Sequence, residues 1–429
     1  MNEFQECAEE MLAFIEKSPS CFHAVANVAE MLEAQGFREL KETDDWNLSH
    51  GERFYVIRND SSLIAFRLPA GRVPKGFHIA ASHSDSPAFK VKEAPEMTVE
   101  ERYLKLNTEK YGGMILSTWM DRALSVAGRV AVRGEKGIET RLVNLDSDLL
   151  VIPNLAVHMN RDINKGVEYN PQVDMLPLYA DCSESDTKNV LGERIARELG
   201  VSAEDILGRD LFLYVREKGR ILGENGEYVL SPKLDDLQCV FASVKGFLES
   251  EPKEYINVCA VFDNEEVGSA TRQGADSTFL EDVLRRIAES LYGGIASLSP
   301  MLAGSFLISA DNAHGVHPNH PEKADPTNRP YLNGGIVIKY HGSQKYTTDA
   351  ISGAKVKALC EQAGVPWQTY ANRSDVVGGS TLGNISTAHV SVESADIGLP
   401  QLAMHSAVET AGVKDTKYAV KLFNAFYSE

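Results

Sequence analysis

The chain has 429 residues, a length that a single hydrophobic core does not usually stabilise. We therefore expect two or three domains or one domain with a large insertion. Lys and Arg number 43 and Asp and Glu 61, giving a formal net charge of −18. Such a charge argues against nucleic acid or an anionic membrane as the partner. With 43% hydrophobic and 24% charged residues, the composition is that of a folded, enzyme-sized globular protein.

The compartment is predicted from what the sequence lacks. The first ten residues are acidic, without the basic and apolar regions of a secretory signal. The apolar run 149–157 is broken by Pro153 and Asn154 and is far shorter than the ~18 residues of a membrane span. The six cysteines stand singly, as is typical of reduced thiols that fill a core. We therefore expect a cytoplasmic protein with no membrane segment.

Hydrophobic periodicity predicts alternating helices and strands. The apolar run 77–82 ends in the polar cluster 83–87, typical of a buried strand that enters a loop. Two later runs end the same way, 255–262 before a run of acidic residues and 306–310 before Asp311. A further strand is predicted over 53–57, and helices are predicted over residues 9–17, 24–35, 235–248, 278–291 and 350–363.

This alternation predicts an α/β fold with a mixed, mainly parallel sheet flanked by helices, whose site lies at the carboxyl ends of the strands. Residues 93–226 differ, with short strand-like runs at 141–145 and 149–152 and many turn residues. We interpret them as a smaller β-rich domain inserted into a domain formed by residues 1–92 and 227–429. The alternative is a single continuous α/β domain with long excursions.

The predicted strand ends carry side chains that could bind a metal ion or take part in catalysis. Phosphate-binding glycine motifs and the zinc-protease motif HExxH are absent from the sequence. Each candidate alone has an ordinary structural explanation, such as a turn, a helix N-cap or a core histidine. Together they supply the mixed nitrogen and oxygen donors of a two-metal hydrolase. These candidates are His83, Asp85, Asp235, Glu265, Glu266, Asp311 and His405.

Five segments carry a family resemblance. Residues 82–87, 231–237, 263–269, 309–319 and 401–406 resemble the successive motifs of the aspartyl aminopeptidase family, in the family's order. The resemblance implies a zinc-peptidase fold and two Zn²⁺ ions per subunit, although Mn²⁺ or Co²⁺ also suit such donors. It implies that His83, Asp235 and Asp311 bind one ion, that Asp235, Glu266 and His405 bind the other, that Glu265 is the general base and that Asp85 orients His83.

The resemblance also implies a substrate pocket and an assembly. The inserted domain would serve in dimerisation or as a lid, and His158 would enter a neighbouring subunit's active site. Subunits would form a tetrahedral dodecamer that admits short peptides and removes N-terminal residues, with acidic ones preferred. Other residues at family pocket positions are His314, Lys339, Tyr346, Ser380, Thr381, Gly383 and Met404.

Two other functions remain open from the sequence. A dinuclear deacylase of N-acyl amino acids would share the metal chemistry, since the substrate pocket distinguishes the two enzymes. A non-catalytic assembled scaffold is disfavoured, because carboxylates buried at several strand ends repel one another without cations.

Overall fold

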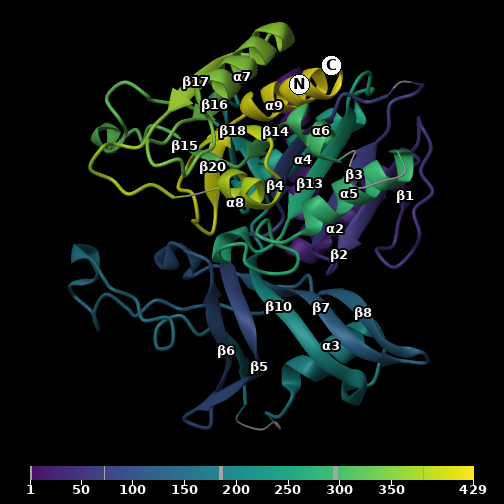
Figure 1. Cartoon of the computed structure of the whole chain (residues 1–429). Coiled ribbons are helices and arrows are strands. Elements are labelled where there is room, and N and C mark those ends of the chain that lie inside the picture. The colour runs from purple at the N-terminus through teal and green to yellow at the C-terminus, as the bar shows by residue number, and fades with distance from the viewer. Residues whose placement is uncertain (1, 72, 183–186, 293–297, 380) are drawn as a thin grey trace. The chain divides into compact units, whose positions relative to one another are not determined.

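The computed structural model describes residues 2–71, 73–182, 187–292, 298–379 and 381–429 (Figure 1). The chain divides into two compact units. The first contains Met1–Asp85, Gly219–Met404 and Glu409–Glu429, and the second contains Ser86–Lys218 and His405–Val408.

The unit boundaries differ by several residues from those expected at 92/93 and 226/227. The first boundary falls earlier because Ala88–Val91 already pairs with β6 (Tyr103–Tyr111), so this run is the start of β5 (Ala88–Val99). The role of the second unit in dimerisation or as a lid stays a prediction.

The first unit is built on a nine-stranded mixed sheet in the order β1-β2-β3-β13-β4-β14-β18-β16-β17. Its centre is parallel, since β4 pairs in parallel with β13 and β14, and β14 pairs in parallel with β18. This is the predicted α/β fold. The strands are β1 (Arg38–Glu39), β2 (Arg53–Arg58), β3 (Ser62–Arg67), β4 (Phe77–His83), β13 (Ile256–Phe262), β14 (Phe306–Ala310), β16 (Ile336–Lys339), β17 (Trp367–Tyr370) and β18 (Glu393–Gly398).

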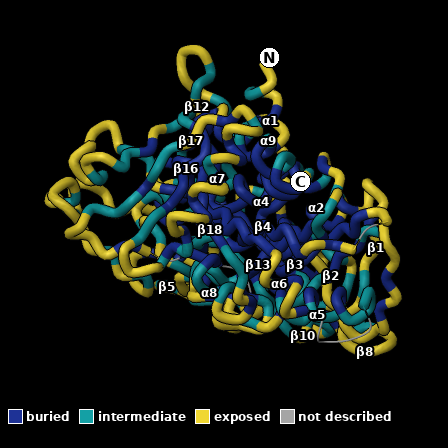
Figure 2. The backbone as a smooth tube through the Cα atoms, turned by 45° about the horizontal axis from the view of Figure 1, so that its top comes forward, coloured by how far each residue is buried: buried dark blue, intermediate teal, exposed yellow. Residues whose placement is uncertain are grey.

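Helices cover both faces of this sheet. Alternate residues of β3 show the two sides: Leu63 and Ala65 pack with one group of helices, whereas Ile64 and Phe66 pack with the other. Figure 2 shows β4 and β13 buried along their length, as expected for strands covered on both faces. One face carries α1 (Glu3–Glu16), α2 (Cys21–Glu33), α4 (Leu234–Leu248), α7 (Ala350–Ala363) and α9 (Asp415–Tyr427), and the other carries α5 (Phe279–Tyr292), α6 (Leu298–Ala303) and α8 (Leu382–His389).

A smaller sheet that the sequence did not predict completes the first unit. Its order is β11-β12-β20-β19-β15. The strands are β11 (Arg220–Leu222), β12 (Tyr228–Ser231), β15 (Ala313–His314), β19 (Pro400–Leu402) and β20 (Glu409–Gly412). Among the described residues, this unit also has the short 3-10 helices η4 (Glu265–Val267) and η6 (Pro321–Lys323).

The second unit is built on a six-stranded antiparallel sheet in the order β8-β7-β10-β5-β6-β9. The run 149–152, predicted as a strand, forms only isolated bridges at Leu150 and Val151 before Pro153. The other elements are β7 (Leu124–Gly134), β8 (Gly137–Asn144), β9 (Leu178–Asp181), β10 (Ile206–Val215), α3 (Val190–Leu199), η1 (Leu116–Trp119), η2 (Ile163–Lys165) and η3 (Ala203–Asp205).

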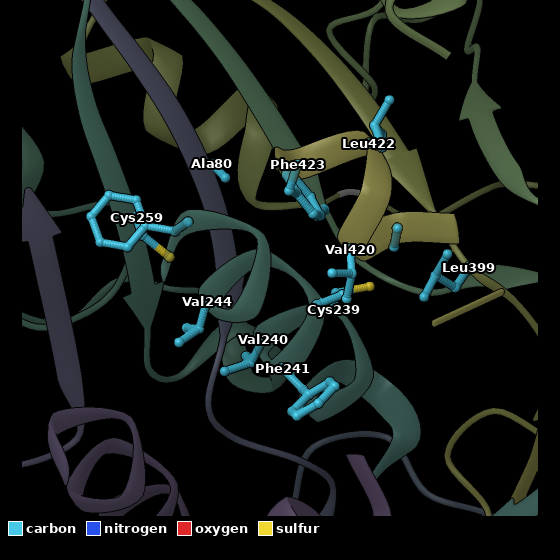
Figure 3. Packing of buried hydrophobic residues seen from close by; sticks show 14 of the residues in the cluster. Ala80, Cys239, Val240, Phe241, Val244, Cys259, Leu399, Val420, Leu422 and Phe423 are labelled. Atoms are coloured by element: carbon cyan, nitrogen blue, oxygen red, sulfur yellow. The ribbon is translucent and has the colours of Figure 1, made fainter. Parts of the chain in front are cut away.

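The cysteines behave as predicted for core thiols. All six are buried, and none of them forms a disulfide bond. Figure 3 shows the side chains of Cys239 and Cys259 among apolar neighbours such as Val240, Val244 and Phe423.

Candidate metal centre and active site

The site lies at one edge of the nine-stranded sheet, where parallel strands end. Phe262 at the end of β13 pairs with His83 at the end of β4, and Ser309 near the end of β14 pairs with Ala81. The residues that follow β13 and β14 therefore emerge beside His83. These are Glu265 and Glu266 in η4 after β13, and Asp311 directly after β14.

Two donor groups made only of described residues of the first unit converge at this edge. One ligand atom from each of His83, Asp235 and Asp311 lies within 4.8 Å of the others, and these three side chains are buried. Atoms of His83, Glu265 and Glu266 meet the same limit. Asp235 comes from the start of α4, in a non-helical conformation (φ −82°, ψ 110°) rather than as an ordinary N-cap.

The imidazole of His83 is held in an orientation that suits a metal ligand. Its Nδ1 lies 3.0 Å from the carbonyl oxygen of Asp85 and 3.3 Å from Asp85 Oδ1. Its Nε2 lies 3.5 Å from Asp235 Oδ1. If Nδ1–H donates to Asp85, the lone pair of Nε2 faces the cluster, the arrangement usual for a ligand histidine.

Asp85 also holds the residues of η4. Its side chain is buried and accepts hydrogen bonds from the backbone N–H groups of Glu265 (3.1 Å) and Glu266 (3.2 Å), one on each oxygen. Asp85 therefore connects the imidazole of His83 to the backbone that positions both glutamates.

The electrostatics of the cluster favour cations. Burial and the nearby carboxylates of Asp311 and Asp235 raise the pKa of Glu265 to about 8. Burial raises the pKa of Asp311 to about 6 and that of Glu266 well above its usual range. Burial alone would lower the pKa of His83, but its contact with Asp235 leaves that pKa well above 6.5. Buried carboxylates that resist ionisation are stabilised by divalent cations, so this donor set fits metal ions.

The predicted pocket residues of the first unit lie in different environments. Lys339 is buried, donates from Nζ to the carbonyl oxygen of Asn312 (2.8 Å) and lies 3.9 Å from Asp311 Oδ2. The ring of Tyr346 is centred 5.5 Å from Lys339 Nζ. His314 is exposed on β15, with its ring 6.2 Å from that of Tyr370. Met404 is half-buried, and Ser380 lies outside the described residues.

Two predicted histidines belong to the second unit. His158 is exposed in the segment that follows Pro153, and the carboxylate of Asp121 accepts hydrogen bonds from the backbone and side chain of Asn154 there (3.0 and 2.7 Å). His405 directly follows Met404, where the segment Gly219–Met404 of the first unit ends. The carbonyl oxygen of His405 accepts a hydrogen bond from the backbone N–H of Ile115 (3.0 Å). Their active-site roles stay predictions.

Two further carboxylates, which were not predicted from the sequence, support the cluster. Asp236 Oδ2 accepts from the backbone N–H of His83 (3.1 Å), and Glu409 Oε2 accepts from the backbone N–H of Asp235 (3.0 Å). Both side chains are buried. The paired aspartates at 235 and 236 were a visible signal for Asp236, whereas Glu409 lies on a strand far along the chain and no local pattern indicates its role.

Comparisons with known proteins identify the family and the fold. The sequence profile described as "Aminopeptidase I zinc metalloprotease (M18)" matches residues 14–427. The chain is 51% identical over 425 residues to a probable M18 family aminopeptidase 2 of Clostridium novyi, covering 98% of each protein. Its fold is similar to that in a cryo-EM structure of the Ape4 and Nbr1 complex (TM-score 0.95, 37% identity, 99% of this chain and 86% of the other). It is also similar to the S. cerevisiae mApe1 dodecamer (TM-score 0.87, 28% identity, 99% and 97%).

The comparisons confirm the predicted resemblance and class of enzyme. They favour an aminopeptidase over the deacylase and the scaffold, because the matched profile spans nearly the whole chain. Within the described residues, no helix is both long and apolar enough to cross a membrane. The chain belongs to the M18 family of zinc aminopeptidases.

Proposed function

We propose that this enzyme removes the N-terminal residue from short peptides, preferentially Asp or Glu, using two metal ions and Glu265 as the general base. The convergence of His83, Asp235, Asp311, Glu265 and Glu266 at one edge of the sheet is the observation that carries the proposal. In it, His83, Asp235 and Asp311 hold one zinc ion, and Asp235, Glu266 and His405 hold the other.

The chain's own residues divide the work of hydrolysis. Bound zinc would supply Lewis-acid chemistry that polarises the scissile carbonyl and makes water a better nucleophile. Glu265, held through its backbone by Asp85, takes a proton from the attacking water. The protonated Glu265 then gives that proton to the leaving amine as the C–N bond breaks, so the reaction consumes one water and regenerates the carboxylate.

The proposal extends to the assembly. The segment that carries His158 exposes large apolar side chains, with Leu155 53%, Val157 50% and Met159 76% accessible, as an interface in an oligomer would require. The S. cerevisiae relative is a dodecamer. We propose a dodecamer here too, with tetrahedral symmetry, in which His158 stabilises the oxyanion in a neighbouring subunit. The buried thiols, which form no disulfide bond, suit a reducing compartment, and the proposed location is the cytoplasm.

Glu265→Gln tests the general base. Because proton transfer by a positioned side chain contributes about 10²–10⁴-fold, we expect kcat to fall by about that factor with the zinc content unchanged. Glu281→Gln is the matched control, because Glu281 pairs with Arg285 on the surface of α5. Near-normal turnover of a fully metal-loaded Glu265→Gln variant would contradict the assignment.

Substrate choice is tested with the wild-type enzyme. Chromogenic amides of Asp, Glu, Leu, Lys and Ala, each with a free and an acylated amino group, should be cleaved only in the free form, and fastest for Asp and Glu. Cleavage of the acylated forms alone would favour the deacylase, and a flat ranking among free amides would refute the acidic preference.

A further inference from the structure

A buried carboxylate beside the cluster has no role in the proposed reaction. Asp396 lies on β18, in the parallel centre of the sheet, and its side chain is fully buried. Its Oδ2 accepts from the backbone N–H (2.6 Å) and hydroxyl (2.9 Å) of Thr347, and its Oδ1 accepts from the hydroxyl of Thr381 (2.5 Å). Three donors from two separate segments thus converge on one carboxylate.

The first of these segments carries a predicted pocket residue. Thr347 follows Tyr346, whose ring is centred 5.5 Å from Lys339 Nζ. On the other side of Thr347, the hydroxyl of Thr348 accepts from the backbone N–H of Asp396 (2.8 Å). Both the side chain and the backbone of Asp396 therefore hold the segment 346–348, and with it the ring that lies against Lys339.

The second segment is the start of α8. Thr381 is the N-cap residue of this helix, but it makes no side-chain capping bond to the helix, and its hydroxyl donates to Asp396 instead. A Cβ atom added to Gly383 would lie 2.5 Å from Asp396 Oδ1 and 2.7 Å from Oδ2. Only glycine allows this close approach, which brings the positive end of the helix dipole to the carboxylate.

We infer that Asp396 is a positioning residue for substrate binding, which fixes Tyr346 and Thr381 as two walls of the pocket beside Lys339 and Asp311. The inference rests on the proposed function and on the pocket positions that the family resemblance implies for Tyr346, Lys339 and Thr381. Asp396 would act through the segments that it holds, without touching the substrate or the metal.

Asp396→Asn tests the inference. The asparagine keeps the shape of the side chain, but its amide nitrogen would face a donor from Thr347 or Thr381. We expect KM for the best amide to rise about tenfold and kcat to change less than about threefold, because substrate binding is lost while the metal cluster stays intact. Zinc content should equal that of the wild type.

Two further variants probe the same contacts separately. Thr381→Val removes one donor, and Gly383→Ala forces a methyl group against the carboxylate, so both should raise KM. If Asp396 acts through Thr381, the double variant Asp396→Asn/Thr381→Val should raise KM by less than the product of the two single effects. Thr369→Val is the matched control, since Thr369 lies on β17, its hydroxyl donates to the side chain of Asn328 (3.0 Å), and loss of that bond should leave KM unchanged.

The kinetic results distinguish a failure of this inference from a failure of the proposed function. Unchanged KM in Asp396→Asn, or a fall in kcat or zinc content at constant KM, would overturn it, since a purely structural role lowers the active fraction without moving KM. If Asp396→Asn does not fold, unchanged KM in Thr381→Val and Gly383→Ala would overturn it equally. Wild-type protein that cleaves none of the amides would contradict the proposed function itself.

Discussion

Asp85 offers the sharpest test of how the site is held together, because one buried carboxylate serves both η4 and His83. In Asp85→Asn, only one side-chain oxygen remains as an acceptor. The amide nitrogen, itself a donor, then faces the backbone N–H of either Glu265 or Glu266, which in the wild type donate to the two carboxylate oxygens of Asp85 at 3.1 and 3.2 Å. The imidazole of His83 also loses a negative charge 3.3 Å from Nδ1.

The magnitude follows from these contacts. A hydrogen bond to a charged group contributes about 1.5–3 kcal/mol, so losing one of the two backbone bonds costs about 2 kcal/mol, or about 30-fold in rate. Weaker support of a ligand histidine reduces metal affinity by about 10–100-fold. We therefore expect kcat/KM of the Asp85→Asn variant to fall about 30-fold at saturating zinc, and its zinc affinity to fall within that range.

The assay combines steady-state hydrolysis of the best amide with zinc titration of the apo protein. Asp276→Asn is the matched control, because the exposed Asp276 also pairs with a histidine, His389 (2.8 Å), on the surface. If Asp85→Asn retains kcat/KM within about threefold of the wild type and binds zinc normally, charge-assisted bonds of this kind do not position the site, and the reasoning is refuted.

The remaining predictions concern stability. Gly246→Ala would place a Cβ 2.5 Å from that of Phe423 between α4 and α9, so the free energy of unfolding should fall by about 1–3 kcal/mol. Gly342 has no neighbouring atom within 4 Å of an added Cβ, so Gly342→Ala should change the free energy of unfolding by less than about 0.5 kcal/mol. Equal effects of the two substitutions in urea unfolding would contradict this packing. His78 is stacked between the rings of Tyr255 and Phe426, and burial lowers its pKa from 6.5 to about 4. Its stabilising contribution is therefore complete above pH 6.5 and decreases by about 3 kcal/mol as the pH falls to 4. His78→Phe should flatten the plot of unfolding free energy against pH between 6.5 and 4. An unchanged slope would show that another group is responsible. Chelation should abolish hydrolysis and lower the melting temperature, and zinc should restore both; a melting temperature indifferent to zinc would argue against ions in the buried cluster.

The part of the site that could be predicted from sequence depends on strand ends. Runs 77–82, 255–262 and 306–310 read as buried strands, and parallel neighbours end at one edge, so the meeting of His83, Glu265 and Asp311 required only the fold class. The strand predicted over 149–152 failed because an apolar run before Pro153 can be buried by bridges alone, without joining a sheet.

Contacts between side chains and distant backbone could not be predicted in this way. Asp85 accepts from N–H groups 180 and 181 positions later, and Glu409 accepts from one 174 positions earlier. A backbone N–H is the same at every residue except proline, so it leaves no sequence pattern that marks the partner. The visible signal was the acidic residue itself, which is equally compatible with a turn or an exposed surface.

These hidden contacts share one physical design. Asp85, Asp236, Asp396 and Glu409 are all buried, and each accepts a hydrogen bond from the backbone of a residue in the site or of a segment beside it. A buried carboxylate is costly unless such donors satisfy it, and a donor fixed in the backbone holds it more rigidly than a flexible side chain can. The negative charges that repel one another at this edge are thus kept in place by neutral peptide groups, so that the Nε2 lone pair of His83 and the carboxylates of Asp235 and Asp311 can serve as metal ligands. For this reason we expect substitutions at the supporting carboxylates to change geometry and affinity, whereas substitution of Glu265 should change the chemical step.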